Sequence, residues 1–253
     1  MSVEAAPSSA SASEGSAAPA AQLVAEKTAA LARLAAGIAH ELRNPLAVIL
    51  ARVQLLELAM KNGKPLAPGK LEMTLRTVSE QAVRASKIIE SLSIFARPRS
   101  PELASVDLAE TVGRVMSEVR TYMPAHATVT SDIQVASEVQ SVVADRAQLT
   151  IALRQLVINA LQAMPDGGAL RIHARGAGGG AEIVVADTGG GVAHHDAARI
   201  FDPFFSTKPA GAGLGLCVVQ TIAEAHGGGV RLVASGGPGA EFVLSLPGQW
   251  RVP

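Results

Sequence analysis

The sequence predicts two structural parts in series: an all-α helical hairpin, and then an α/β sandwich in which helices cover one face of a mixed sheet. Three observations support this prediction. Apolar residues recur every three or four positions from Leu31 to Ala96, which is the period of an α-helix. From about Leu103, short apolar segments typical of strands alternate with helical segments and glycine-rich turns. The 253 residues are enough for two domains with hydrophobic cores.

Two helices are expected in the first part. Residues 1–22 are almost wholly Ala, Ser, Pro and Gly, which bury too little apolar surface to offset the entropy of ordering, so a disordered tail is expected. The first helix is expected at 23–61, with a bend near Pro45, because proline removes a backbone donor and clashes with the preceding turn. The second helix is expected at 71–96, where the apolar spacing alternates between three and four, as in coiled-coil seams.

These helices are expected to form an antiparallel hairpin over residues 23–97, because only a short turn separates them. One hairpin leaves much of each apolar stripe in water, whereas two hairpins close a four-helix bundle. We therefore predict a homodimer; in the alternative interpretation, the hairpin packs on the rest of its own chain. Pro98 and Pro101 end the second helix, so residues 98–106 are expected to be a linker to a second domain at 107–253.

The second domain is expected to contain three helices. Asp107 caps the first, which ends near Arg120; the second runs from Asp145 to Met164, and the third covers 213–226. Strands are expected at 127–133, 139–143, 169–175, 181–186, 230–234 and 241–246, the last four as two pairs of neighbours.

The composition argues against several classes of protein. The 22 basic and 22 acidic residues cancel, so broad electrostatic binding to nucleic acid or anionic membrane is not expected. Apolar runs are shorter than the ~18 residues of a membrane span, and no basic residue precedes Lys27, so a secretory signal is not expected either. The single cysteine, Cys217, fits a reducing compartment. We therefore expect a cytoplasmic protein.

His40 is the candidate nucleophile. It follows the apolar Ile38 by two residues, about 200° round the helix, so it points away from the apolar stripe. Three interpretations apply. His40 is an ordinary exposed histidine, or it is a nucleophile whose ring the Glu41 carboxylate orients. The third interpretation, a zinc ligand of a His-Glu-x-x-His site, is disfavoured because Asn44 replaces the second histidine. The interpretation as a nucleophile requires a phosphoryl donor elsewhere in the chain.

A candidate site for that donor lies in the second domain. Asn159 lies beside the apolar stripe of its helix, and an amide oxygen there suits a Mg²⁺ ion that bridges to nucleotide phosphates. Asp187 ends an apolar strand, so its carboxylate can accept a hydrogen bond from an amino group such as that of adenine. The glycines after it, Gly189 and Gly191 among them, let backbone approach a flat ligand.

Two further segments complete the candidate site. Phe201, Phe204 and Phe205 are expected to anchor a loop that carries Lys208. The glycines that open the last helix offer free N–H groups and the positive end of a helix dipole to phosphate; they are Gly211, Gly213 and Gly215. Neither residues 63–70 nor 211–215 have the spacing or context of a P-loop or Rossmann motif.

Five motifs in this order resemble those of bacterial sensor histidine kinases. They are the H box, His-Glu-Leu-Arg-Asn at 40–44, the N box at 155–160, the G1 box at 187–191, the F box at 201–205 and the G2 box at 211–216. The resemblance covers residues 27–247. The segment 206–210 resembles the nitrogen-regulator-like cytoplasmic type.

The resemblance implies a dimeric phosphoacceptor hairpin followed by an ATP-binding sandwich of the GHKL (Bergerat) type. It implies that His40 attacks the γ-phosphorus of ATP while Glu41 orients or deprotonates its ring. The phosphoryl group then passes to an aspartate of a response regulator. Asn44 matches the family position that places a water when such kinases dephosphorylate their partner, so phosphatase activity is expected as well.

The resemblance also implies that Asn159 binds Mg²⁺ and that Asp187 and the glycines bind ATP. Two positions depart from the family pattern: Gln155 replaces an asparagine, and Gln162 replaces a lysine that reaches the phosphates, so Lys208 is the candidate source of that charge. Two competing interpretations remain. The first, an ATPase or chaperone-like member of the same superfamily, is disfavoured because an H-box hairpin precedes the nucleotide domain. The second, a phosphotransfer scaffold that no longer binds ATP, is disfavoured because Asn159 and Asp187 are intact.

Overall fold

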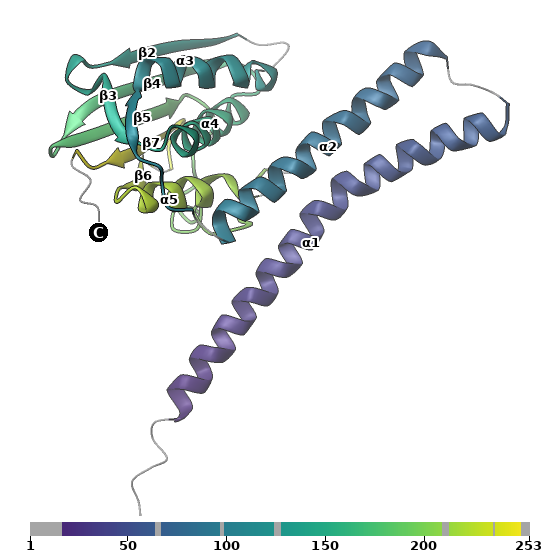
Figure 1. Ribbon diagram of the computed structural model, residues 1–253, viewed down its shortest axis with the longest axis horizontal. Helices are drawn as coiled ribbons and strands as arrows, with labels where there is room; N and C mark the ends of the chain where they lie inside the picture. The colour runs from purple at the N-terminus through teal and green to yellow at the C-terminus, as the bar shows by residue number, and fades with distance from the viewer. Residues whose placement is uncertain are drawn as a thin grey trace, which may run out of the picture.

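The computed structural model describes residues 17–63, 67–96, 99–123, 128–208, 213–234 and 236–248, with side chains from Ala36 onward except those of Thr121 and Ala234. Two long helices, α1 (Ala17–Lys61) and α2 (Pro68–Ala96), form a hairpin. Figure 1 shows this hairpin projecting from an α/β domain that lies near the C-terminal end of α2. In the described part of the chain, no helix combines the length and apolar character that a membrane span needs.

Helix α1 begins earlier than the sequence analysis expected. Residues 17–22, assigned there to the tail, form its first turns, because alanine is the strongest helix former and Pro19 is tolerated in a first turn. The rest of that expected tail, residues 1–16, lies outside the described residues. The helix continues through Pro45, which is buried, and Figure 1 shows α1 changing direction partway along its length.

The hairpin exposes apolar side chains on both of its helices. In the single chain, Leu50 is 57% exposed and Leu58 is 55% exposed. Other large apolar residues of the two helices are exposed as well: Leu46, Val48, Val53, Leu55, Met60, Leu71, Met73, Leu75, Val83 and Ile89. Apolar side chains exposed in such number on two neighbouring helices are typical of an interface with another protein surface, as the predicted four-helix bundle requires.

The α/β domain is built on a five-stranded mixed sheet. Its strand order is β2-β4-β5-β7-β6, with β2 parallel to β4 and every other pair antiparallel. The strands are β2 (Val129–Val135), β4 (Gly168–Ala177), β5 (Gly180–Asp187), β6 (Gly229–Ala234) and β7 (Ala240–Leu246). A second, two-stranded sheet pairs β1 (Ala104–Asp107) with β3 (Ser141–Ala144). Strand β1 lies largely within the expected linker 98–106, so the α/β domain begins earlier than the sequence analysis placed it.

Three helices pack on one face of the five-stranded sheet (Figure 1): α3 (Leu108–Glu118), α4 (Arg146–Ala163) and α5 (Gly215–Ala225). Two short 3₁₀ turns cover Val119–Tyr122 and Ser137–Val139. The predicted caps are confirmed at α3 and α4, where the carboxylates of Asp107 and Asp145 accept backbone N–H groups of the first turn. The apolar stripe predicted on α4 is buried against the sheet: Leu153, Leu156, Val157, Ala160 and, just beyond the helix, Met164.

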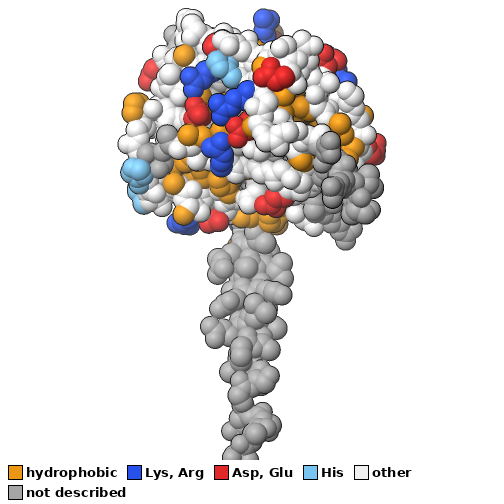
Figure 2. Space-filling view, turned by 90° about the vertical axis from the view of Figure 1, so that its left-hand side faces the viewer, with side chains coloured by type: hydrophobic (Ala, Val, Ile, Leu, Met, Phe, Trp, Pro, Cys, Tyr) orange, Lys and Arg blue, Asp and Glu red, His pale blue; other side chains and the backbone are white. Residues whose placement is uncertain are grey.

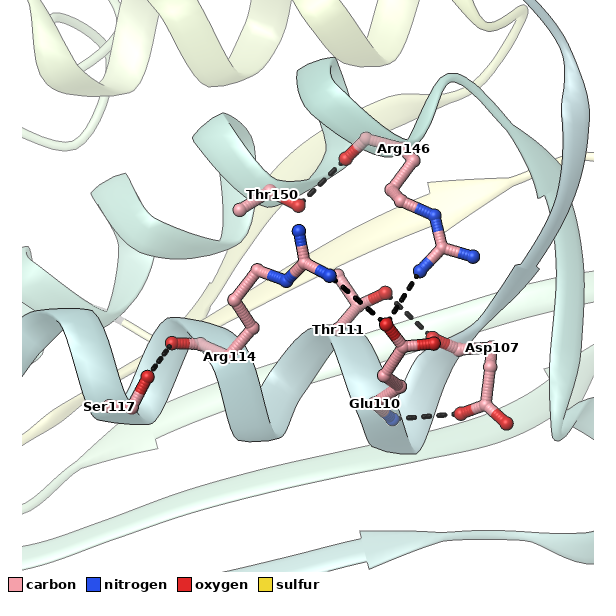
Figure 3. A network of polar contacts seen from close by, with 7 residues as sticks. All are labelled: Asp107, Glu110, Thr111, Arg114, Ser117, Arg146 and Thr150. Carbon is pink, nitrogen blue, oxygen red and sulfur yellow. Dashed lines mark hydrogen bonds and ion pairs between the residues drawn. The ribbon is translucent and has the colours of Figure 1, made fainter.

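Helices α3 and α4 are also joined by a polar network. Figure 3 shows the Glu110 carboxylate on α3 between Arg114 and Arg146, each with a nitrogen 3.0 Å from Oε1. The two arginines hold the pKa of Glu110 below its usual range, with Arg146 contributing most. Because all three side chains are exposed, this network orients the helix ends more than it stabilises the fold.

The outer face of the sheet is charged. Glu182 on β5 pairs with Arg175 on β4 at 2.8 Å and with Arg231 on β6 at 3.0 Å, and Arg171 pairs with Glu241 at 2.7 Å. Figure 2 shows basic and acidic side chains intermixed on one face of the molecule. Because residues that alternate with these point into the core, one face of the sheet carries the helices and the other meets solvent.

Candidate nucleotide site and phosphoacceptor helix

A cavity of about 810 Å³ lies between the hairpin and the α/β domain. Its walls come from α2, α4, the segment from Asp187 to Phe205, and the start of α5. This volume is in the range of small-molecule sites. Six of the residues predicted from the sequence line it: Asn159, Asp187, Gly191, Lys208, Gly213 and Gly215.

Asn159 and Lys208 are in direct contact. The Lys208 ammonium donates to the backbone carbonyl of Asn159 at 3.1 Å and lies 3.4 Å from its Oδ1, and it also donates to Gln162 Oε1 at 3.1 Å. Burial lowers the pKa of Lys208, an effect that the nearby Asp187 carboxylate partly offsets. A positive charge is thus accommodated at the Asn159 oxygens, so this donor set fits a magnesium ion that completes its shell with water and phosphate oxygens.

Asp187 ends β5 at the wall of the cavity and is only 9% exposed. One of its oxygens, Oδ1, accepts the N–H of Gly189 at 2.9 Å, which fixes the orientation of the carboxyl group. Burial raises the pKa of Asp187, although backbone N–H groups and the Lys208 charge act in the opposite direction. A carboxylate held in such a place binds a ligand N–H donor strongly, because water competes little for it.

The glycines after Asp187 serve the packing of the domain itself. A Cβ at Gly189 would lie 2.3 Å from the carbonyl oxygen of Ala163, at the end of α4. At Gly191, where φ is +72°, a Cβ would lie 2.1 Å from the carbonyl oxygen of Gly237. These glycines are thus needed for close packing of the chain on itself, and Gly191 also lines the cavity, so the expectation that this turn admits a flat ligand stays a prediction.

The start of α5 faces the cavity. Its N-cap residue, Leu214, makes no side-chain capping bond, and Leu214, Gly215 and Leu216 all line the cavity. The first N–H groups of a helix lack partners within the helix, so they are suited to an anion. Gly213, with φ at +65°, turns the chain into this helix, and Gly211 lies outside the described residues.

The three phenylalanines of the F box contact three different elements. The Phe201 ring meets Phe242 of β7 edge-on, with centroids 6.5 Å apart, and Arg199 lies 4.7 Å from the Phe205 ring centre. Phe204, with φ at +64°, packs on Gly37 of α1. The anchor predicted from the sequence is present, but its contact with α1 was missed, because nothing in the F box itself points to a helix far away in the sequence.

The H-box residues lie apart from this cavity. His40 and Asn44 are exposed on α1, Glu41 is half-buried, and none of the three is among the residues that line the cavity in the described chain. The structure thus brings the nucleotide motifs together but not the phosphoacceptor candidate. His40 lies about one helical turn beyond Gly37, a residue of α1 that meets the F box.

Sequence reasoning also missed a set of cavity residues on α2. Arg76, Arg84 and Lys87 line the same cavity as Asn159 and Asp187. Their spacing of eight and three residues places them on one face of a helix. This spacing is the feature of the sequence from which a basic face on α2 could have been predicted.

Two family descriptions match this chain. Residues 30–101 match the "His Kinase A (phospho-acceptor) domain", and residues 144–249 match the "Histidine kinase-, DNA gyrase B-, and HSP90-like ATPase". Fold and site therefore define a phosphoacceptor hairpin joined to an ATPase-type domain. By this pair of domains and by its similarity to known sensor kinases, the chain belongs to the bacterial sensor histidine kinase family, as its five motifs predicted.

Individual relatives agree with this assignment. "Sensor histidine kinase ZraS" of Escherichia coli O157:H7 is 33% identical over 231 residues, which cover 88% of this chain and 47% of ZraS. The chain thus spans about half the length of this curated relative. The crystal structure of full-length ShkA in complex with AMPPNP is 28% identical, with a TM-score of 0.63 over 85% of this chain and 45% of ShkA.

A further solved structure supports the fold alone. Histidine kinase ThkA, in complex with the response regulator protein TrrA, superimposes with a TM-score of 0.66 at 22% identity. The alignment covers 88% of this chain and 64% of ThkA.

Proposed function

We propose that this chain is the kinase portion of a two-component system. It binds ATP with Mg²⁺, phosphorylates itself on His40, and passes the phosphoryl group to an aspartate of a response regulator. One observation carries the proposal: a single cavity gathers Asn159, Asp187, Lys208 and the uncapped start of α5, in a chain that also presents an exposed histidine on a phosphoacceptor hairpin.

The residues of the cavity divide the work of binding. The Asp187 carboxylate accepts a hydrogen bond from the amino group of adenine. The N–H groups at the start of α5 and the Lys208 ammonium donate to phosphate oxygens. The Asn159 Oδ1 would hold Mg²⁺. When bound, that ion offsets the negative charge of the phosphates.

His40 supplies the nucleophile. A ring nitrogen attacks the γ-phosphorus, the bond from that phosphorus to the β–γ bridging oxygen breaks, and ADP leaves. Glu41, next along α1, orients the ring or takes its proton. Because His40 lies outside the cavity of its own chain, the transfer requires either that the α/β domain moves relative to α1 or that the acceptor is the His40 of the second copy.

The proposal includes three further properties. The exposed apolar side chains of α1 and α2 are covered by a second copy of the chain in a homodimeric four-helix bundle. The response regulator docks near His40, because it receives the phosphoryl group from that residue, and Asn44 positions a water for dephosphorylation of that regulator. The chain acts in the cytoplasm, where the single cysteine, Cys217, stays reduced.

The proposal is tested by incubating the purified chain with Mg²⁺ and γ-labelled ATP. A label that is acid-labile and alkali-stable, as a phosphohistidine is, should appear in the wild type and be lost in His40→Gln and Asn159→Ala. His195→Gln is the matched control, because that histidine is exposed and lies outside the H box. His40→Gln should still bind nucleotide. Label retained by His40→Gln would assign the phosphoacceptor elsewhere, and ATP turnover without any label would indicate a plain ATPase.

A further inference from the structure

One face of α2 is basic and lies on the cavity that holds the nucleotide motifs. Arg76, Glu80, Arg84 and Lys87 follow one another at spacings of four, four and three residues, so they form one stripe along the helix. All four line the cavity. Of the four basic residues in α2, three therefore face the cavity, whereas Lys70 does not belong to its lining.

Helix α2 is attached to the α/β domain beside this stripe. Ile88 is 4% exposed and belongs to the core of the domain. Lys87 contacts Tyr122, with Nζ bonded to the phenol oxygen and 4.9 Å from the ring centre. Arg154 of α4 lies 3.5 Å from Glu90 of α2. Apolar, cation–π and ionic contacts thus hold the wall of the cavity in place.

The pair formed by Glu90 and Arg154 relates the two walls of the cavity. Arg84 lies six residues before Glu90 on α2, and Asn159 lies five residues after Arg154 on α4. At a rise of ~1.5 Å per residue, each lies roughly 7–9 Å along its helix from the pair. Both residues line the same cavity, Arg84 from α2 and Asn159 from α4.

The charge of the cavity makes α2 relevant to phosphate. At position 162 the chain carries a neutral glutamine, and its amide oxygen is occupied by Lys208. Lys208 is a cation that the α/β domain places beside Asn159, and Arg154, which also lines the cavity, is paired with Glu90 and Glu118. A nucleoside triphosphate carries several negative charges. A guanidinium matches phosphate oxygens with two parallel N–H bonds. Arg84 is half-buried on the α2 wall of the cavity and is placed to supply such a group, whereas the Arg76 side chain is 80% exposed.

We propose that Arg84 is a further nucleotide-binding residue, which contacts the phosphates of ATP from the hairpin across the domain boundary. This inference rests on the proposed function, since it concerns the same site. Its consequence is that bound ATP becomes part of the contact between hairpin and α/β domain. A change in the position of α2 then alters the affinity for ATP directly.

The test measures binding to the full-length chain by calorimetry, with a non-hydrolysable ATP analogue, AMP-PNP, and with adenosine, both in the presence of Mg²⁺. Arg84→Ala should lower the affinity for AMP-PNP about tenfold, as expected for the loss of one charge-assisted contact. It should change the affinity for adenosine less than twofold. Arg84→Lys should recover part of the loss. Lys70→Ala, on the same helix outside the cavity, should bind both ligands like the wild type.

Two results would overturn the inference while leaving the nucleotide site intact. One is normal AMP-PNP affinity in Arg84→Ala and in the double variant with Arg76→Ala. The other is an equal loss for adenosine and AMP-PNP in Arg84→Ala, which would assign Arg84 a structural role. If the wild type binds no AMP-PNP, the proposed site itself fails, and this inference fails with it.

Discussion

The ring of Phe204 occupies the space that a side chain at Gly37 would need, since a Cβ there would lie 2.8 Å from the phenylalanine Cγ. Phe204 is the one non-glycine residue with positive φ in the described chain, and its N–H donates to the Gly213 carbonyl at 2.8 Å. This bond closes the loop that carries Lys208. Helix α1 therefore rests, about one turn before His40, on the base of the loop beside the nucleotide cavity.

We expect Gly37→Ala to separate α1 from the F box, because the new methyl group cannot share the space of the ring. Amide hydrogen exchange in residues 200–208 should rise about tenfold, which corresponds to a loss of ~1.4 kcal/mol in local stability. Gly113→Ala is the matched control, since a Cβ at Gly113 meets nothing within 4 Å. Unchanged exchange in Gly37→Ala would show that this contact does not hold the loop.

Nucleotide affinity should depend on the protonation of Lys208. Burial lowers its pKa, and only the ammonium form attracts phosphate, so AMP-PNP affinity should fall as the pH rises through this lowered pKa. Lys208→Arg should move the decline to higher pH, because a guanidinium stays charged there. Calorimetric titrations between about pH 7 and 10 would measure the effect. An identical pH profile in the two proteins would exclude Lys208 as its origin.

The N-cap of α4, Asp145, should make the free energy of unfolding depend on pH. Burial raises the pKa of Asp145, but N–H groups of Gln148, Glu102 and Ala147 outweigh it, and the net shift is downward. A carboxyl whose pKa is lower in the folded state stabilises the fold above its unfolded pKa of about 3.9, and this contribution is lost as the pH falls through the folded value.

Asp145→Ala should therefore lower the free energy of unfolding by about 1–2 kcal/mol at pH 7, and the difference from the wild type should shrink toward pH 3. Urea denaturation at several pH values would measure it. The buried His226, whose Nε2 accepts the Asp145 N–H at 3.0 Å, remains in both proteins. A difference that does not change with pH would contradict the role given to the carboxylate.

Cys217 should be inert in the folded protein. It is buried on α5, and burial raises the pKa of its thiol to about 12, so little thiolate exists near neutral pH. Alkylation by iodoacetamide should be at least about 100-fold slower than in urea-unfolded protein, where the pKa is ordinary. Since the chain has a single cysteine, the mass of the labelled protein reports this site alone. Fast native labelling would indicate that α5 opens readily.

The apolar surface of the hairpin should hold two chains together. Leu50→Glu places a charge on this surface, so light scattering should show a fall from twice the chain mass to the single mass of 25.9 kDa. Val143→Glu is the control, because Val143 is 45% exposed on β3 of the α/β domain. A wild type of single-chain mass would contradict the predicted homodimer.

Much of the fold follows from signals that are local in the sequence. The apolar period predicted α1 and α2, and Asp107 and Asp145 marked the starts of α3 and α4, since a cap acts within one turn of its helix. Strand β1 was missed because its ladder partner, β3, lies more than 30 residues away, and a four-residue strand carries little signal of its own. The nucleotide motifs were recognised because each is short and continuous.

The sequence by itself thus determined the kinds of elements, their order and the residues suited to bind a nucleotide. Only the tertiary structure decided which of these residues meet: Lys208 with Asn159, Phe204 with Gly37, and Arg84 with the nucleotide cavity. The physical reason is that periodicity and capping act over a few residues, whereas packing joins surfaces far apart in the chain. The tertiary structure also places the exposed His40 outside the cavity that is proposed to bind its phosphoryl donor.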